Sequence, residues 1–289
     1  MELGIGLPAT VPDVERGSLL DWSRKSEENG FSSLGVVDRI VYPNYEPLIS
    51  LTAAAAVTER IRFATTVLVG PLRTNTALLA KELATLDNLS EGRLVLGIGL
   101  GAREDDYTAS GLEPKRRGAI LDRQLEDMKR VWAGEGLGDA DPIGPPPARQ
   151  GGPVILIGGG ADASARRAAR FGDGWIAPGG PPEQFKGMPD KVDAAWAEAG
   201  RSGKPRKAAL AYFSLGPRAE ENANTYLHHY YAWLGDEVAG MIVGGAAISE
   251  QMVKAYVQAF DDSGCDELFM FPCSTDVEQV DLLAEAAGL

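Results

Sequence analysis

Three consecutive glycines, Gly158, Gly159 and Gly160, stand between a short apolar run and a segment with helical spacing. Glycine lets backbone N–H groups approach an anion closely, and the amino end of a helix adds a partial positive charge. Arginines follow this turn at Arg166, Arg167 and Arg170. We therefore expect a phosphate-binding turn here. The alternative is a tight turn in which glycine serves only the backbone dihedral angles.

A second glycine-rich segment, Gly97-Ile98-Gly99-Leu100-Gly101, also follows an apolar run. Its spacing differs from the G-x-G-x-x-G dinucleotide fingerprint. Carboxylates come directly after it, at Glu104, Asp105 and Asp106. These carboxylates would repel a pyrophosphate. We expect Gly97 and Gly99 to leave room for a flat ring or a substrate, with close packing of the chain as the alternative.

Asp38 and Arg39 end a third apolar run. A carboxylate beside a guanidinium at a strand end can orient a polar group of a cofactor or substrate. A purely structural ion pair is the alternative. Short hydrogen-bonding side chains lie on or after the next run, at Thr65, Thr66 and Asn75. We expect them at the same rim.

Other catalytic templates are absent from the chain. It contains no G-x-x-x-x-G-K-[ST] phosphate loop, no H-E-x-x-H and no G-x-S-x-G elbow. The two histidines, His228 and His229, are neighbours that point about 100° apart on a helix, so we expect no metal site. A chain with few acid–base groups but an anion site suggests that a bound cofactor carries the reaction.

The elements that must position these residues are short apolar runs that alternate with longer amphipathic segments. Eight runs are candidate strands: Leu3 to Leu7, Ser33 to Val37, Arg62 to Val69, Arg93 to Ile98, Val154 to Ile157, Gly174 to Ala177, Ala208 to Ser214 and Leu268 to Phe271. Nearly continuous apolar runs are typical of a parallel sheet that is buried on both faces. We predict a (β/α)8 barrel, with a doubly wound open sheet as the alternative. In such a barrel the active site lies at the carboxyl ends of the strands.

We expect a single barrel domain over residues 1–289. Its βα alternation is interrupted by a Gly- and Pro-rich excursion at 134–153 and resumes afterwards. The region 216–249 is longer than one crossover helix requires. Its aromatic residues make it a possible lid, with packing of a helix on the barrel as the alternative: Tyr226, Tyr230, Tyr231 and Trp233.

Charge and composition exclude several classes of function. The net charge of −13 disfavours binding to nucleic acid and to anionic membranes. No apolar run is long enough for a membrane helix, and the first residues do not resemble a signal peptide. Cys265 and Cys273 flank a strand and lie too far apart for a disulfide. We therefore expect a cytoplasmic protein with reduced thiols.

Taken in order along the chain, these segments resemble the luciferase-like monooxygenases, a family whose members use FMN or coenzyme F420. The resemblance is carried by Arg60–Val69, Leu79–Asp87, Ser90–Gly99, Arg116–Gly118, Ile157–Gly159 and Ala168–Ile176. It implies a luciferase-like (β/α)8 barrel, expected to be a homodimer. By this resemblance Thr65, Thr66, Val67 and Leu68 would lie against the cofactor ring. Gly158 to Gly160 would hold its phosphate, and Trp175 and Ile176 would help complete the pocket.

The chain departs from the family at the second strand. Many relatives resemble Asp-His or Glu-His there, whereas this chain has Asp38-Arg39. Arg39 would hold an anionic group or stabilise negative charge that develops on the flavin. Asp38, Arg39 and Thr66 are therefore the candidate catalytic residues.

The resemblance implies an oxidoreductase, and we expect a monooxygenase that uses reduced FMN on a small organic substrate. A separate flavin reductase would supply the reduced cofactor. The first alternative is an F420-dependent reductase or dehydrogenase that transfers hydride, in which basic residues hold the anionic tail: Arg103, Lys115, Arg116 and Arg117. The second alternative is a non-catalytic flavin-binding protein.

Overall fold

The structure is a computed structural model that describes residues 1–289. Eight parallel strands close into a barrel in chain order, because β1 pairs with β8 as well as with β2. The strands are β1 (Glu2–Gly6), β2 (Ser33–Val36), β3 (Arg62–Val69), β4 (Leu94–Gly99), β5 (Val154–Gly158), β6 (Gly174–Ile176), β7 (Arg206–Phe213) and β8 (Glu267–Pro272). The predicted (β/α)8 barrel is confirmed, because in the alternative, an open sheet, the first and last strands would not pair with each other.

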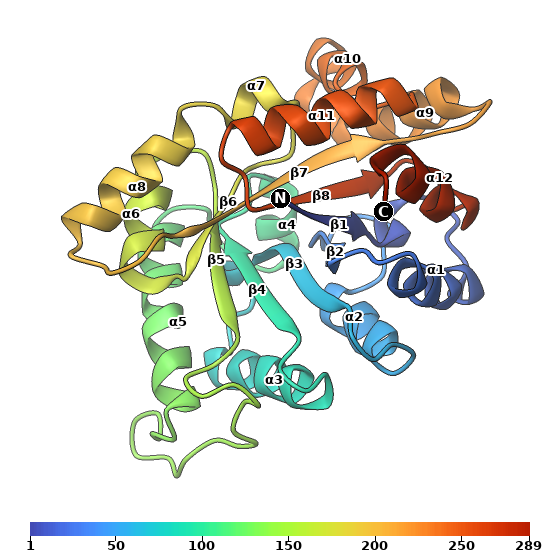
Figure 1. Ribbon diagram of the computed structural model, residues 1–289. Coiled ribbons are helices and arrows are strands. Elements are labelled where there is room, and N and C mark those ends of the chain that lie inside the picture. The colour runs from blue at the N-terminus through green and yellow to red at the C-terminus, as the bar shows by residue number, and fades with distance from the viewer.

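Helices surround the strands in chain order, as Figure 1 shows. The α-helices are α1 (Arg16–Glu28), α2 (Pro47–Ala55), α3 (Thr76–Leu89), α4 (Glu104–Ala109), α5 (Arg117–Trp132), α6 (Asp162–Phe171), α7 (Pro182–Phe185), α8 (Met188–Glu198), α9 (Ala219–Tyr231), α10 (Asp236–Gly244), α11 (Glu250–Asp262) and α12 (Glu278–Ala287). Three short 3-10 helices are η1 (Pro8–Thr10), η2 (Gly70–Leu72) and η3 (Ala232–Leu234). None of the helices is both long and apolar enough to span a lipid bilayer.

Alternate residues of each strand supply two separate cores. One face of the strands packs against the helices, as Leu68, Ile157 and Trp175 do. The other face fills the barrel interior, where Ile176 and Phe271 lie. Because successive side chains on a strand point to opposite faces, neighbours in sequence belong to different cores. This alternation decides which side chains reach the barrel mouth.

A polar network closes the amino end of the barrel. The fully buried carboxylate of Glu267 accepts hydrogen bonds from the hydroxyls of Ser32 and Ser33, each at 2.6 Å. It also forms ion pairs with Arg62 at 3.1 Å and Arg206 at 2.8 Å. A buried carboxylate with this many donors is well satisfied, so this end is a structural plug. The cavities that involve the candidate site residues lie at the carboxyl end.

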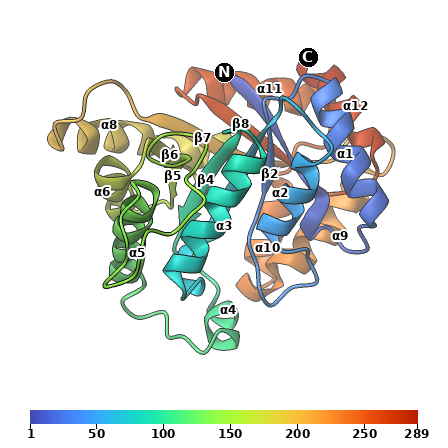
Figure 2. The same ribbon diagram turned by 90° about the horizontal axis from the view of Figure 1, so that it is seen from below.

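The two irregular regions lie at opposite ends of the barrel. Residues 134–153 contain no helix or strand and lead from the end of α5 into the start of β5, which is the amino end. Residues 216–249 form α9, η3 and α10. Figure 2 shows α9 and α10, together with α4, toward the end of the molecule away from both termini. The possible lid is therefore at the expected end, and its motion remains a prediction.

Candidate functional site

A small hollow lies at the barrel mouth, between the carboxyl ends of β2, β3 and β4 and the end of α9. Its volume is about 200 Å³. It is lined by Asp38, Arg39, Val69, Leu72, Gly101, Ala102, Arg103, Asp106, Tyr107, Tyr230, Tyr231 and Trp233. The hollow is smaller than the roughly 300–1,000 Å³ of most small-molecule sites. The hollow by itself can therefore enclose only part of a ligand of that size.

Arg39 is held by two carboxylates of α4. Its Nη2 atom lies 3.0 Å from Asp105, and its Nε atom lies 2.9 Å from Asp106. Asp106 also accepts hydrogen bonds from the backbone N–H groups of Ile40 and Val41, at 3.0 and 2.7 Å. Only 4% of the Arg39 side chain is exposed, and its Nη1 atom has no hydrogen-bond partner. The two N–H groups of this Nη1 atom are therefore buried donors that the protein itself leaves unsatisfied.

Asp38 does not pair with the neighbouring Arg39, which corrects the picture of a charged pair at the end of β2. Its carboxylate accepts hydrogen bonds from the Val69 N–H at 2.9 Å and from Arg73 at 3.0 Å. Burial raises the pKa of the Asp38 carboxyl, and the Arg73 guanidinium opposes that shift. Arg73 is shared with Glu46 at 2.8 Å. Asp38 thus fixes the end of β3 beneath the hollow.

Consecutive residues of β3 make different contacts. The Thr65 hydroxyl donates to the Gly97 carbonyl at 2.6 Å, and the Thr66 hydroxyl donates to the Val36 carbonyl at 3.1 Å. The Thr66–Val67 peptide is cis, and the register with β4 shifts between Thr65 and Leu68. Leu68 is fully buried against the helix layer. The resemblance implied that Leu68 would contact a cofactor ring at the mouth, but its side chain points toward the helices.

The glycines of β4 and β5 accommodate Val67. A Cβ atom at Gly99 would lie 2.9 Å from a Val67 methyl, and one at Gly158 would lie 2.8 Å from the other methyl. A Cβ atom at Gly97 would clash with the Thr65 carbonyl oxygen. Close packing of the chain therefore accounts for Gly97 and Gly99. Val67 is only partly buried and packs against the barrel interior, where it can form a wall of the mouth.

The triglycine turn connects β5 to α6 at the rim. Gly159 has φ = +132°, a conformation that other residues rarely adopt, and a Cβ there would clash with Ser164. Gly160 is exposed, and the nearest atom to its Cβ position is 3.6 Å away, on Pro178. The Trp175 indole N–H donates to the Gly159 carbonyl at 2.7 Å. Trp175 thus supports the turn from the helix side and does not face the mouth.

Two of the three arginines on α6 form ion pairs with α5, and the third does not. Arg167 pairs with Asp122 at 2.6 Å, and Arg170 pairs with Glu126 at 2.6 Å. These two arginines join α6 to α5 and do not serve the turn. The exposed cations outside such pairs are Arg166 on α6 and, just before α5, Lys115 and Arg116. Arg166 lies on the helix that follows the glycine turn, and Lys115 and Arg116 come just before α5, which packs beside α6.

Aromatic residues of α9 and η3 cover the small hollow. The Arg103 guanidinium lies 4.4 Å from the ring centroid of Tyr230 and 4.8 Å from that of Trp233. It also donates to the Tyr230 carbonyl at 2.9 Å. The Tyr42 hydroxyl lies 2.7 Å from Nδ1 of His229, which joins the β2–α2 loop to α9. Sequence reasoning missed the role of Tyr42, whose only signal is its position shortly after a predicted strand end.

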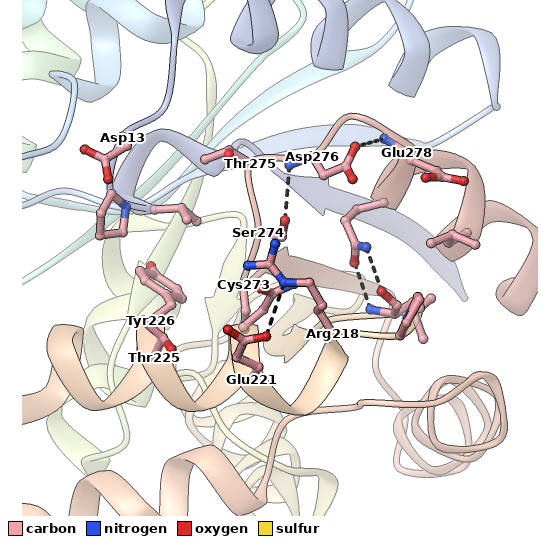
Figure 3. A pocket seen from close by; sticks show the side chains of 18 residues that line it. Asp13, Arg218, Glu221, Thr225, Tyr226, Cys273, Ser274, Thr275, Asp276 and Glu278 are labelled. Atoms are coloured by element: carbon pink, nitrogen blue, oxygen red, sulfur yellow. Dashed lines mark hydrogen bonds and ion pairs between the residues drawn. The ribbon is translucent and has the colours of Figure 1, made fainter.

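A large chamber lies on the other side of the mouth, between the carboxyl ends of β7, β8 and β1. Its volume is about 710 Å³. Side chains from all three loops and from α9 and α12 line it, and Figure 3 shows how they face the opening. Its labelled residues include Asp13, Arg218, Glu221, Tyr226, Asp276 and Glu278. Sequence reasoning missed this chamber, although polar residues do follow each of the three strands.

Comparisons with known proteins agree with this architecture. An uncharacterized protein of Mycobacterium tuberculosis is 37% identical over 174 residues, which are 57% of this chain and 61% of that protein. An F420-dependent glucose-6-phosphate dehydrogenase of Nocardia farcinica is 32% identical over 221 residues, covering 70% of this chain and 65% of the relative. Each match thus spans less than two thirds of the relative's length. The crystal structure of a monooxygenase from Streptomyces bottropensis superposes with a TM-score of 0.80 at 24% identity, over 99% of this chain and 98% of the other.

The model of one protein family, described as luciferase-like monooxygenase, matches residues 1–264. This range includes the first seven strands, the glycine turn and all of the residues that line the small hollow. The resemblance in the sequence is thereby confirmed. The chain belongs to the luciferase-like monooxygenase family.

Proposed function

We propose that this protein is an oxidoreductase that binds coenzyme F420 at the barrel mouth and transfers hydride between this deazaflavin and a small organic substrate. The observation that carries the proposal is a set of exposed cations just before α5 and on α6, two neighbouring helices of which α6 follows the glycine turn: Lys115, Arg116 and Arg166. F420 has an anionic tail beyond its phosphate, and such a tail requires positive charge at the rim. The name of the Nocardia farcinica relative supports the same cofactor.

The residues at the mouth fit a cofactor of this kind. The open position beside Gly160 leaves space for a phosphate, and the amino end of α6 adds partial positive charge. The unpartnered Nη1 atom of Arg39 offers a hydrogen bond to a ring oxygen. Val67 provides an apolar wall against which a flat ring would lie. When bound, the deazaflavin supplies a carbon centre that accepts or gives up a hydride.

The protein's own residues would orient the ring and exclude water from it. Asp38 holds the end of β3 through the Val69 N–H. Asp106 holds Arg39 and the β2–α2 loop in place, so Arg39 keeps a fixed orientation toward the hollow. Tyr230 and Tyr231 shield the hollow from solvent. The Thr66 hydroxyl, already donating to Val36, has lone pairs that can accept a hydrogen bond from the ring.

An absorbance titration of the purified full chain with F420 and with FMN tests the proposal. We expect saturable binding of F420 and much weaker binding of FMN. Under anaerobic conditions, the bound reduced F420 should then be oxidised when a suitable substrate is added. Tight binding of FMN with no binding of F420 would overturn the proposed cofactor.

The second candidate function is a monooxygenase that uses reduced FMN, with a separate flavin reductase as its partner. The description of the matching family as luciferase-like monooxygenase favours it. The two functions differ in their need for oxygen, because only the monooxygenase consumes dioxygen in proportion to product. An oxygen electrode therefore separates them.

We further propose that two copies of the chain associate through α2 and α3. Three apolar side chains on these helices are exposed: Ile49 (71%), Leu89 (64%) and Leu78 (49%). They surround a groove of about 450 Å³ that also carries Lys81 and Glu82. Opposite charges on one face can pair with each other across a two-fold axis, which suits association of identical copies. Exposed apolar patches of this kind commonly mark interfaces.

A further inference from the structure

The large chamber is separate from the small hollow that the proposed cofactor would occupy. No residue expected to contact the cofactor lines the chamber. Its lining includes the apolar side chains of Val11, Leu215 and Leu282. Most of the lining is polar, with hydroxyl, amide and charged groups from three loops and two helices. Its volume of about 710 Å³ lies within the usual range for small-molecule sites.

One pair of aromatic rings separates the chamber from the hollow. Tyr226 lines the chamber and Tyr230 lines the hollow, and both project from α9. Their ring centroids are 5.6 Å apart. The Tyr226 hydroxyl lies 2.7 Å from the Thr10 hydroxyl, which holds this ring in place. A molecule in the chamber is thus one ring layer away from the cofactor hollow, and a shift of α9 would join the two spaces.

Negative charge dominates the chamber. Its lining contains four carboxylates, from Asp13, Glu221, Asp276 and Glu278, and one guanidinium, from Arg218. Arg218 is already paired with Glu221 at 3.2 Å. Figure 3 shows this pair on one side of the opening, with Asp13 and the Asp276 and Glu278 carboxylates on others. The three remaining carboxylates have no cationic partner within the chamber.

We infer that the large chamber is the substrate end of the active site and that it selects organic molecules that carry an ammonium group. This inference rests on the proposed function, because it places the substrate beside the proposed cofactor hollow. The attraction between the carboxylates and an ammonium group favours such molecules, and the apolar side chains in the lining can contact their hydrocarbon part. The same charges repel phosphate esters. This chain therefore differs in substrate class from a relative whose name specifies a sugar phosphate.

The test uses two aromatic probes that differ in charge, tyramine as the cation and 4-hydroxyphenylacetate as the anion, together with glucose 6-phosphate. Binding to the full chain is measured by ligand-observed NMR, without cofactor and then with F420. We expect tyramine to bind at least tenfold more tightly than either anion. The preference should shrink as salt is added, because the carboxylates are exposed to solvent.

Two substitutions test whether tyramine binds in the chamber. Asp13→Asn and Glu278→Gln each remove one exposed carboxylate, and asparagine tolerates the positive φ of 62° at position 13. Each should weaken tyramine binding about threefold, and the double variant about tenfold, in keeping with the modest strength of exposed ion pairs. The control Asp139→Asn removes an exposed carboxylate at the amino end of the barrel and should change nothing.

The outcomes separate this inference from the proposed function. Equal binding of all three probes, tighter binding of an anion, no binding of tyramine, or a tyramine preference that the double variant leaves unchanged would each overturn the inference. If F420 binds but the charge preference is absent, only the inference fails. If the preference holds but neither F420 nor FMN binds, the chamber selects amines and the proposed cofactor chemistry is wrong.

Discussion

Tyr226 and Tyr230 lie on α9 with their ring centroids 5.6 Å apart, and together they separate the small hollow from the large chamber. Both side chains are buried, so the wall is well packed. A cofactor in the hollow and a substrate in the chamber, as proposed, would meet only where this wall opens. On that proposal, the position of α9 would control the contact between the two ligands.

Removing one ring should open the wall. We predict that Tyr230→Ala speeds association of F420 severalfold, because it enlarges the hollow. It should also lower the free energy of unfolding by about 3–5 kcal/mol, as expected for deleting a buried aromatic ring. Stopped-flow fluorescence and urea denaturation measure the two effects. Tyr45→Ala, at an exposed tyrosine, should change neither by a comparable amount. An unchanged association rate in Tyr230→Ala would show that another element limits entry.

The two carboxylates that hold Arg39 should contribute unequally to the free energy of unfolding. Asp106 is buried and also accepts two backbone N–H bonds, whereas the Asp105 side chain is 46% exposed. We predict that Asp106→Asn lowers the free energy of unfolding by about 3–5 kcal/mol, because it leaves a buried guanidinium undercompensated. Asp105→Asn should cost at most about 1 kcal/mol. Chemical denaturation of both variants measures the difference, and equal losses would show that Asp106 is not the main partner.

Much of the fold could be predicted from the sequence, because each barrel strand is a short apolar run followed by a turn. The eight predicted strands are all present, and their ends differ from the structure by at most two residues, as at β7, which begins at Arg206 instead of Ala208. The glycine turn was found because it directly follows β5, a position that any βα unit places at the mouth.

The site could be predicted only in part, because several contacts depend on how distant loops pack. The partners of Arg39 lie on the short helix α4, where Asp105 is 66 residues further along the chain and Asp106 follows it. Trp175 and Ile176 were both placed in the pocket, but neighbouring strand residues face opposite sides, and only Ile176 faces the barrel interior. The pairing of β3 with β4 shifts register between Thr65 and Leu68. Simple alternation along the strand therefore cannot predict which side of the sheet Leu68 faces. The large chamber combines carboxylates from separate loops, each of which looks like an ordinary surface residue.

Association of two copies should depend on the exposed apolar face of α2 and α3. We predict that Leu78→Glu converts the protein to monomers at micromolar concentration, because it places a charge in an apolar interface. Met241→Glu, on an exposed methionine of α10, should leave the oligomeric state unchanged. Sedimentation velocity measures both. A dimer that persists in Leu78→Glu would place the interface elsewhere.

Alkaline pH should destabilise the fold through its tyrosines. Burial raises the pKa of Tyr42 from its ordinary value of 10 to about 12, and it raises the pKa values of Tyr212 and Tyr226 well above 10. The native state therefore keeps these protons after the unfolded chain has begun to release them, and the associated stability is lost as pH rises from about 10 toward 12. Urea denaturation at stepped pH should show this decline. A free energy of unfolding that is constant across that interval would contradict the burial of these phenols.

The central claim, that the glycine turn holds the phosphate of a deazaflavin at the barrel mouth, is tested most directly by comparing the wild type with Gly160→Ala. The added methyl has room in the protein, since the nearest atom is 3.6 Å away, but it occupies the space that a phosphate would need. Fluorescence titration with F420 should therefore show at least tenfold weaker binding to Gly160→Ala, while its melting temperature stays close to that of the wild type. Equal affinity for F420 in the two proteins, or no F420 binding to the wild type, would contradict the account.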